Sequence, residues 1–156
     1  MKLINPIQNA GLLRRSLAVL IAALLCHFSS AQTEQPAAAD VLTDAVASKL
    51  LNQVAEGLQG HSSRKMLAAF DLSRMNGGAI FREQITAFFN QHETIRVHFK
   101  LVNVTENVAV VDAEMEETPR NAITPPQHKS TELRFTAARE GSGWKFVDVQ
   151  PRGFFN

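Results

Sequence analysis

The sequence predicts an α+β fold, in which three helices precede a four-stranded antiparallel sheet. Up to Phe89, apolar residues recur every three or four positions, which is the spacing of one helix face. From Thr94 onward they alternate with polar residues, which is the spacing of a strand with one buried face. Because all the strands follow all the helices, we expect the three N-terminal helices to pack on one face of the sheet.

The length and composition of the chain exclude several classes of protein. Its 156 residues are enough for one domain with a substantial core, but not for two. Sixteen lysines and arginines oppose fifteen acidic residues, whereas a nucleic-acid-binding protein would carry a basic surface. One cysteine excludes a disulfide framework and a CxxC-type zinc site. The chain also contains no tyrosine.

The first 31 residues have the composition of a secretory signal peptide. They contain three basic residues and no acidic residue, then an apolar run from Leu17 to Cys26, then small residues at 29–31. We expect cleavage between Ala31 and Gln32, and a secreted or periplasmic protein. The alternative is an uncleaved membrane anchor, but a spanning helix needs roughly 20 apolar residues and this run is shorter.

Cleavage would change the properties of the remaining chain. It would leave 125 residues with thirteen basic and fifteen acidic side chains, a net charge of −2. The single cysteine would be removed, so the mature chain would have neither a thiol nucleophile nor a disulfide. Residues 32–39 are polar and contain alanine and proline, so we expect a flexible leader before a domain over 40–156.

The helical part of the chain divides into three predicted segments. Asp40 is the expected N-cap of the first helix, and Gly60 is its expected end. The apolar face of this helix is formed by Leu42, Val46, Leu50, Val54 and Leu58. Ser62 or Ser63 is expected to cap a short second helix, whose apolar side holds Met66, Leu67, Ala69 and Phe70. After a break over 71–78, a third helix is predicted from Ile80, Phe81, Ile85, Phe88 and Phe89.

Four strands are predicted in the second half of the chain. The buried faces of the first three are expected to hold Ile95, Val97, Phe99 and Leu101, then Ala109, Val111, Ala113 and Met115, then Thr131, Leu133, Phe135 and Ala137. A loop from Thr118 to Lys129 contains three prolines, which cannot donate to a sheet ladder. A hairpin turn over 140–143 precedes the fourth strand, from Trp144 to Val149.

Four segments, with the sequences MLAAFD, FREQITAFF, IRVHF and GWKFVDV, give the chain a resemblance to a known superfamily. Their pattern is similar to that of the nuclear transport factor 2-like, or ketosteroid isomerase-like, superfamily, over roughly residues 41–155. The resemblance implies a curved, cone-like sheet with the helices packed on one face. This superfamily includes enzymes, transport adaptors and binding modules, so the fold alone does not select a function.

Asp71 is the first candidate catalytic residue. The resemblance implies that an isomerase-type enzyme would hold a carboxylate base inside the cone, opposite an oxyanion hole centred on a tyrosine. Asp71 follows the second helix, where such a base could lie, but the chain has no tyrosine to act as the donor. The alternative is that Asp71 caps the break after the helix, through Ser73 or a neighbouring amide.

Asp148 is the second candidate, because it shares strand parity with Trp144 and Phe146. If these residues face inward, the carboxylate lies in an aromatic cavity, where its pKa would rise. If Lys145 and the alternate residues face inward instead, Asp148 lies on the surface, where it could pair with Arg152. A candidate pocket for a small apolar ligand would be lined by Phe81, Phe88, Trp144 and Phe146.

Two rows of charged residues are expected on the opposite face of the sheet. The first strand carries a basic row and the second an acidic row: Arg96, His98 and Lys100, and Asp112, Glu114 and Glu116. They could form cross-strand pairs on the solvent face, each contributing about 0.2–1 kcal/mol. They could also form a charged binding surface, and a homodimer through this outer face would use it.

The remaining motifs do not indicate a cofactor. The histidines lack the spacing of a metal site, and no phosphate-binding glycine motif or GxSxG sequence occurs. We therefore expect no metal, no cofactor and no nucleic-acid partner.

The sequence favours an exported, non-enzymatic module that binds an apolar ligand or another protein. The first alternative is an isomerase- or dehydratase-like enzyme with a carboxylate base in the cone, and the second is a structural homodimer. An open cone containing a carboxylate would favour the enzyme, whereas a cone filled by apolar side chains would not. The C-terminal Phe154 and Phe155 are expected to pack against the helices or a partner.

Overall fold

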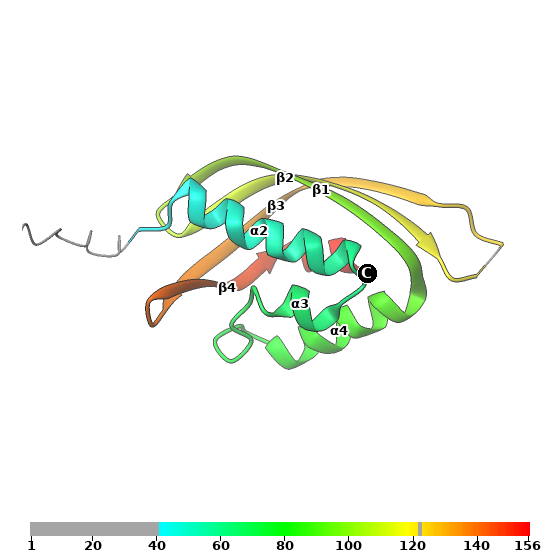
Figure 1. The fold of residues 1–156 in the computed structure, drawn as a ribbon, viewed down its shortest axis with the longest axis horizontal. Helices are drawn as coiled ribbons and strands as arrows, with labels where there is room; N and C mark the ends of the chain where they lie inside the picture. The colour runs from blue at the N-terminus through cyan, green and yellow to red at the C-terminus, as the bar shows by residue number, and fades with distance from the viewer. Residues whose placement is uncertain (1–40, 122) are drawn as a thin grey trace, which may run out of the picture. The chain divides into compact units, whose positions relative to one another are not determined.

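The computed structural model describes residues 41–121 and 123–156, which belong to the compact unit Ala38–Asn156 (Figure 1). The predicted signal peptide, its cleavage site at Ala31–Gln32 and the leader over 32–39 lie outside the described residues. Within the described part, no helix is long and apolar enough to cross a membrane. The predicted α+β class is confirmed, because the helices precede a curved four-stranded antiparallel sheet.

The first described helix, α2, spans Asp44–Gln59 and lies across the concave side of the sheet (Figure 1). Its N-cap is Thr43, whose hydroxyl oxygen accepts a hydrogen bond from the Val46 amide at 3.4 Å, so the predicted cap at Asp40 is wrong. Leu42, the first residue of the apolar pattern, is buried but precedes the helix, which begins about one turn after the predicted cap. Gly60 ends the helix as predicted.

Replacing Thr43 with alanine tests this cap. The change removes the side-chain acceptor at the N-terminus of α2, so we expect the free energy of unfolding to fall by about 1 kcal/mol. Chemical denaturation monitored by circular dichroism measures the change. Thr43→Ser keeps the acceptor and should retain most of the stability, whereas equal losses in both variants would contradict the assignment.

Helix α3, Ser63–Leu67, packs directly on α2. Ser62 caps it through its side-chain oxygen, which accepts a hydrogen bond from the Lys65 amide at 3.2 Å. The close approach of the two helices requires Gly57, because a Cβ atom there would lie 2.3 Å from the Met66 backbone nitrogen.

Helix α4, Gly78–Gln91, contains one residue that was wrongly expected in the core. Phe81, Ile85, Phe88 and Phe89 are buried, but Ile80 is 70% exposed. Successive helical residues are rotated by about 100°, so Ile80 lies outside the buried stripe that begins at Phe81. Gly77 precedes the helix with φ +69°, a left-handed conformation that favours glycine.

The sheet has the order β1-β2-β3-β4, and all neighbouring strands are antiparallel. The strands are β1 His92–Thr105, β2 Val108–Pro119, β3 Gln127–Glu140 and β4 Gly143–Gln150. The predicted loop from Thr118 to Lys129 is therefore too long, since β2 pairs with β1 as far as Pro119 and β3 pairs with β2 from Gln127. Pro119 is compatible with this pairing because it is the last residue of its strand, while Pro125 and Pro126 lie in the connection.

A bulge in β4 changes which of its residues face inward. Thr136 pairs with Asp148, but the next residue of β3, Ala137, pairs with Phe146, so Val147 has no partner in the register. Phe146 and Val149 are both fully buried as a result, although they differ in parity. Both predicted alternatives assumed uninterrupted alternation along this strand, so neither describes all of its inward-facing residues. The predicted pairing of Asp148 with Arg152 is confirmed.

The segment between α3 and α4 pairs with β4, and the C-terminal segment packs on α4. Phe70 forms a single parallel bridge with Phe146, in which the Asp71 amide donates to the Phe146 carbonyl at 2.8 Å. The C-terminal 3-10 helix η2, Arg152–Phe155, contacts α4. The predicted packing of the tail against the helices is confirmed, because Phe154 and Phe155 are buried and the Phe155 ring lies 6.2 Å from that of Phe81.

Candidate functional site

The concave side of the sheet is filled by aromatic side chains. The ring centroids of Phe70 and Phe81 lie 5.2 Å apart, and those of Phe135 and Phe146 lie 4.7 Å apart. Phe70 and Phe146 join these two pairs at 5.6 Å. These distances are typical of packed aromatic clusters, so this part of the interior is core.

The predicted lining of an apolar pocket belongs largely to this core. Phe81, Phe88 and Phe146 are each at most 2% exposed, and Trp144 is half-buried and packs against the core cluster. None of the four residues lines either of two hollows on the surface of the described domain. Within that domain, these aromatic side chains contact other side chains of the core.

Asp71 accepts hydrogen bonds within its own turn. Its Oδ1 atom accepts from the Ser73 hydroxyl at 2.5 Å and from the amides of Ser73 and Arg74 at 3.1 and 3.3 Å. The hydrogen bond from the Ser73 hydroxyl is the main reason that the pKa of Asp71 lies below its usual value. A carboxylate held in its ionised form in this way is a poor general base at neutral pH.

Asp148 pairs with the C-terminal segment. Its Oδ1 atom accepts from Arg152 Nη2 at 2.7 Å, and its Oδ2 atom accepts from Gln150 Nε2 at 3.2 Å. Burial alone would raise the pKa of Asp148, but the hydrogen bonds from Arg152 and Gln150 outweigh this effect, and the pKa is lowered. The carboxylate therefore joins β4 to η2.

A buried ionic cluster that was not predicted from the sequence forms where β1 begins and β2 ends. Glu117 is 3% exposed, and its Oε2 atom lies 2.9 Å from Lys129 Nζ. Its Oε1 atom lies 3.6 Å from Nε2 of His92, another buried side chain. Glu117 Oε2 has no aligned hydrogen-bond donor, so Lys129 acts on it mainly through charge. Lys129 instead donates to the main-chain oxygen of Asn156 at 2.8 Å.

A signal for this cluster was present in the alternation of β2. Glu117 continues the inward-facing row that contains Ala113 and Met115, and extending the strand by one residue would have placed this acid in the core. The partners of Glu117 come from other strands, His92 from β1 and Lys129 from β3. Only the register of the sheet brings them close to Glu117.

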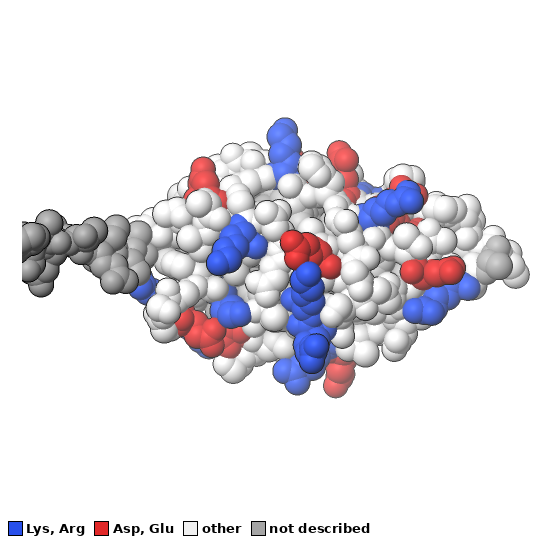
Figure 2. Space-filling view, in the orientation of Figure 1, with Lys and Arg blue, Asp and Glu red and all other residues white. Residues whose placement is uncertain are grey.

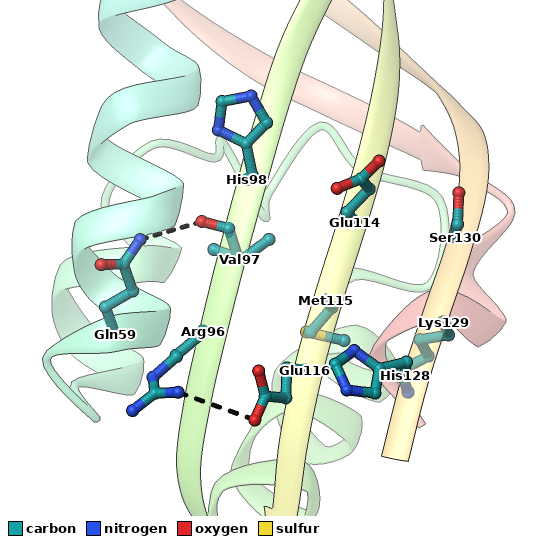
Figure 3. A pocket seen from close by; sticks show the side chains of 10 residues that line it. All are labelled: Gln59, Arg96, Val97, His98, Glu114, Met115, Glu116, His128, Lys129 and Ser130. Carbon is teal, nitrogen blue, oxygen red and sulfur yellow. Dashed lines mark hydrogen bonds and ion pairs between the residues drawn. The ribbon is translucent and has the colours of Figure 1, made fainter. Parts of the chain in front are cut away.

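The opposite face of the sheet carries the predicted charged rows, and it is hollowed. Figure 3 shows His98, Glu114 and Ser130 projecting from three neighbouring strands, with Arg96 directed toward Glu116. This outer-face hollow has a volume of about 620 Å³. It is lined by Gln59, Arg96, Val97, His98, Glu114, Met115, Glu116, His128, Lys129 and Ser130.

The charged rows pair only loosely within the domain. Arg96 Nη1 lies 3.6 Å from Glu116 Oε1, and Lys100 Nζ lies 4.0 Å from Asp112 Oδ2. The Arg96 and Lys100 side chains are about three-quarters exposed, so these pairs contribute little to stability. Within the described residues, no group of three or more histidine, cysteine or acidic side chains is arranged to hold a metal ion.

Comparison with solved structures identifies the fold. A protein from Novosphingobium aromaticivorans assigned as a scytalone dehydratase matches with a TM-score of 0.57 and 11% identity, over 67% of this chain and 79% of that one. A hexachlorocyclohexane dehydrochlorinase, LinA type 2, matches with a TM-score of 0.51 and 9% identity, over 67% and 80%. The domain has the nuclear transport factor 2-like fold. The predicted resemblance is thereby confirmed.

A third solved structure that matches is a conserved protein from Planctomyces limnophilus. Its TM-score is 0.58 at 10% identity, over 67% of this chain and 91% of that one. No protein-family model and no curated protein matches the sequence. Solved relatives of this fold include enzymes and a protein known only as conserved, so the comparisons establish the architecture and leave the activity to the site.

Proposed function

We propose that this protein is an exported, non-enzymatic module that binds a protein partner through the outer face of its sheet. The packing of Phe70, Phe81, Phe135 and Phe146 inside the curve of the sheet carries the proposal. An isomerase- or dehydratase-like enzyme needs that space for its substrate and for a carboxylate base. A cone filled by side chains favours recognition at the surface.

The state of the two candidate carboxylates also favours a non-enzymatic module. The pKa of Asp71 and that of Asp148 are both lowered, because each carboxylate accepts hydrogen bonds from neighbouring residues. A lowered pKa makes each carboxylate a weaker proton acceptor at neutral pH than the base such an enzyme needs. The absence of tyrosine removes the usual donor to an enolate.

A second copy of the chain is the partner that best fits the charges of the outer face. Arg96, His98 and Lys100 pair in register with Glu116, Glu114 and Asp112. A two-fold axis parallel to the strands, between β1 and β2, would place the basic row of one copy over the acidic row of the other. Each row would then face opposite charge at the same level along the strand, which stabilises the pair and fixes its register.

Sedimentation of residues 32–156 with two charge-reversed variants tests this proposal. Arg96→Glu with Lys100→Glu makes the outer face acidic, and Glu114→Lys with Glu116→Lys makes it basic. We expect the wild type to form a dimer that weakens as salt rises, each variant alone to be monomeric, and the mixture to form a heterodimer. Lys49→Glu on α2 is the control and should dimerise like the wild type, since Lys49 is exposed on a helix.

Two outcomes would contradict this proposal. A wild-type chain that stays monomeric at low salt and high concentration would exclude the second copy as partner, and so would two variants that each dimerise like the wild type. Native mass spectrometry of the protein purified from its own host would then report any other bound protein or ligand. The same spectrum tests export, because cleavage at the proposed site gives the mass of a chain beginning at Gln32.

A further inference from the structure

A second hollow opens between α3, α4 and β4, away from the outer sheet face. This α3–α4 basin has a volume of about 700 Å³, and its charged lining comprises Arg64, Arg82, Lys145, Asp71 and Glu140. Hydroxyl groups of Ser63, Ser73 and Thr86 also line it. Figure 2 shows Lys and Arg side chains over α3 and its border with α4, with acidic side chains beside them.

The two arginines of the basin are distinguished by their lack of partners. Among the described residues, neither Arg64 nor Arg82 forms an ion pair or donates a side-chain hydrogen bond. Arg96, Arg134 and Arg152, in contrast, each face a carboxylate within 3.6 Å. The guanidinium groups from α3 and α4 therefore keep all of their donors available on the wall of one hollow.

The acidic residues of the basin only partly offset this positive charge. Three cationic side chains face two carboxylates, and Asp71 already accepts three hydrogen bonds from Ser73 and Arg74. Lys145 donates to the Ala68 carbonyl, which fixes its ammonium group at the wall while its charge remains. The basin is therefore an electropositive hollow with two free guanidinium groups.

We propose that the α3–α4 basin binds a tetrahedral oxyanion, the phosphate or sulfate group of a larger molecule. A guanidinium group presents parallel N–H donors that match two oxygens of such a group, and a lysine nearby adds a compact charge. A single ion would leave most of the volume empty, whereas a hollow of this size is typical of sites for small organic molecules. This site is separate from the proposed dimer face, so both can be occupied at once.

Titration of ¹⁵N-labelled residues 32–156, followed by NMR at constant ionic strength, tests the proposal. The probes are inorganic phosphate, sulfate and acetate, with chloride as the balancing anion. We expect phosphate and sulfate to give saturable shifts at amides around Arg64, Arg82 and Lys145, and acetate to bind more weakly because it carries one charge. Arg64→Gln with Arg82→Gln should weaken phosphate binding by roughly tenfold or more, since charge-assisted hydrogen bonds are lost.

Arg134→Gln is the matched control, because it removes an exposed arginine of the outer sheet face that pairs with Glu132. It should leave phosphate binding unchanged. Equal shifts in the wild type and the double variant, shifts that rise linearly without saturation, or equal binding of acetate would each overturn the proposal. A difference between phosphate and sulfate would identify which oxyanion the basin prefers. Both arginines are exposed, so thermal melts should show that the variants fold normally.

Discussion

Deletion of the C-terminal segment 151–156 should strongly destabilise the domain. The segment places the rings of Phe154 and Phe155 in the core, and burial of each ring contributes about 1.5–3 kcal/mol. It also accepts hydrogen bonds from Gln84 and Lys129. We therefore expect the free energy of unfolding to fall by about 3–6 kcal/mol, a large part of the stability of a domain of this size.

Thermal melts followed by circular dichroism, together with sedimentation, measure this effect. Gly153→Ala is the control within the same segment, because a Cβ atom there would come no closer than 3.8 Å to a neighbouring atom. It should leave the melting temperature nearly unchanged. If the shortened chain had the wild-type melting temperature and the wild-type oligomeric state, the assigned role of the tail would be wrong.

The second large effect is expected for Glu117→Ala. The change removes the buried carboxylate while its partners, His92 and Lys129, remain in place. Breaking a buried ion pair by removing one partner typically costs about 3–5 kcal/mol. Because Lys129 keeps its hydrogen bond to the Asn156 oxygen, we expect a loss near the lower end of this range, about 3 kcal/mol. Urea denaturation of the variant should show a loss of this size.

Glu83→Ala provides the comparison for this experiment. Glu83 is exposed on α4 and lies outside both the proposed dimer face and the basin, so its replacement should change stability by no more than about 0.5 kcal/mol. Equal losses for Glu83→Ala and Glu117→Ala would show that the buried cluster has no special role. A stable Glu117→Ala variant would show that Lys129 turns to solvent when its partner is removed.

The regular elements could be predicted because their signals are local. The apolar stripe of α2 and the alternation of β1 and β2 follow from side-chain geometry within a single helix or strand. Gly60 and Ser62 mark a helix end and a helix start through their own backbone preferences. The errors at Asp40 and Ile80 lie at helix starts, where a short pattern fixes the face and the first residue poorly.

The surroundings of the candidate site residues were harder to predict, because some of their contacts come from other strands and helices. Asp71 could be linked to Ser73 from sequence, since the two lie in the same turn. The surroundings of Asp148 depend on the bulge at Val147, which is set by pairing with β3 and by the contact of Phe70 with Phe146. Alternation within β4 carries no information about such a bulge.

By itself, the sequence determined that helices precede an antiparallel sheet, that one sheet face is apolar and the other charged, and that no tyrosine is present to serve an enolate. The tertiary structure decided that phenylalanines from helices and strands meet inside the curve, and that Glu117 meets His92 and Lys129. The physical reason is distance along the chain. Periodicity describes neighbours within one element, whereas core packing and buried ion pairs depend on the register between elements far apart in sequence.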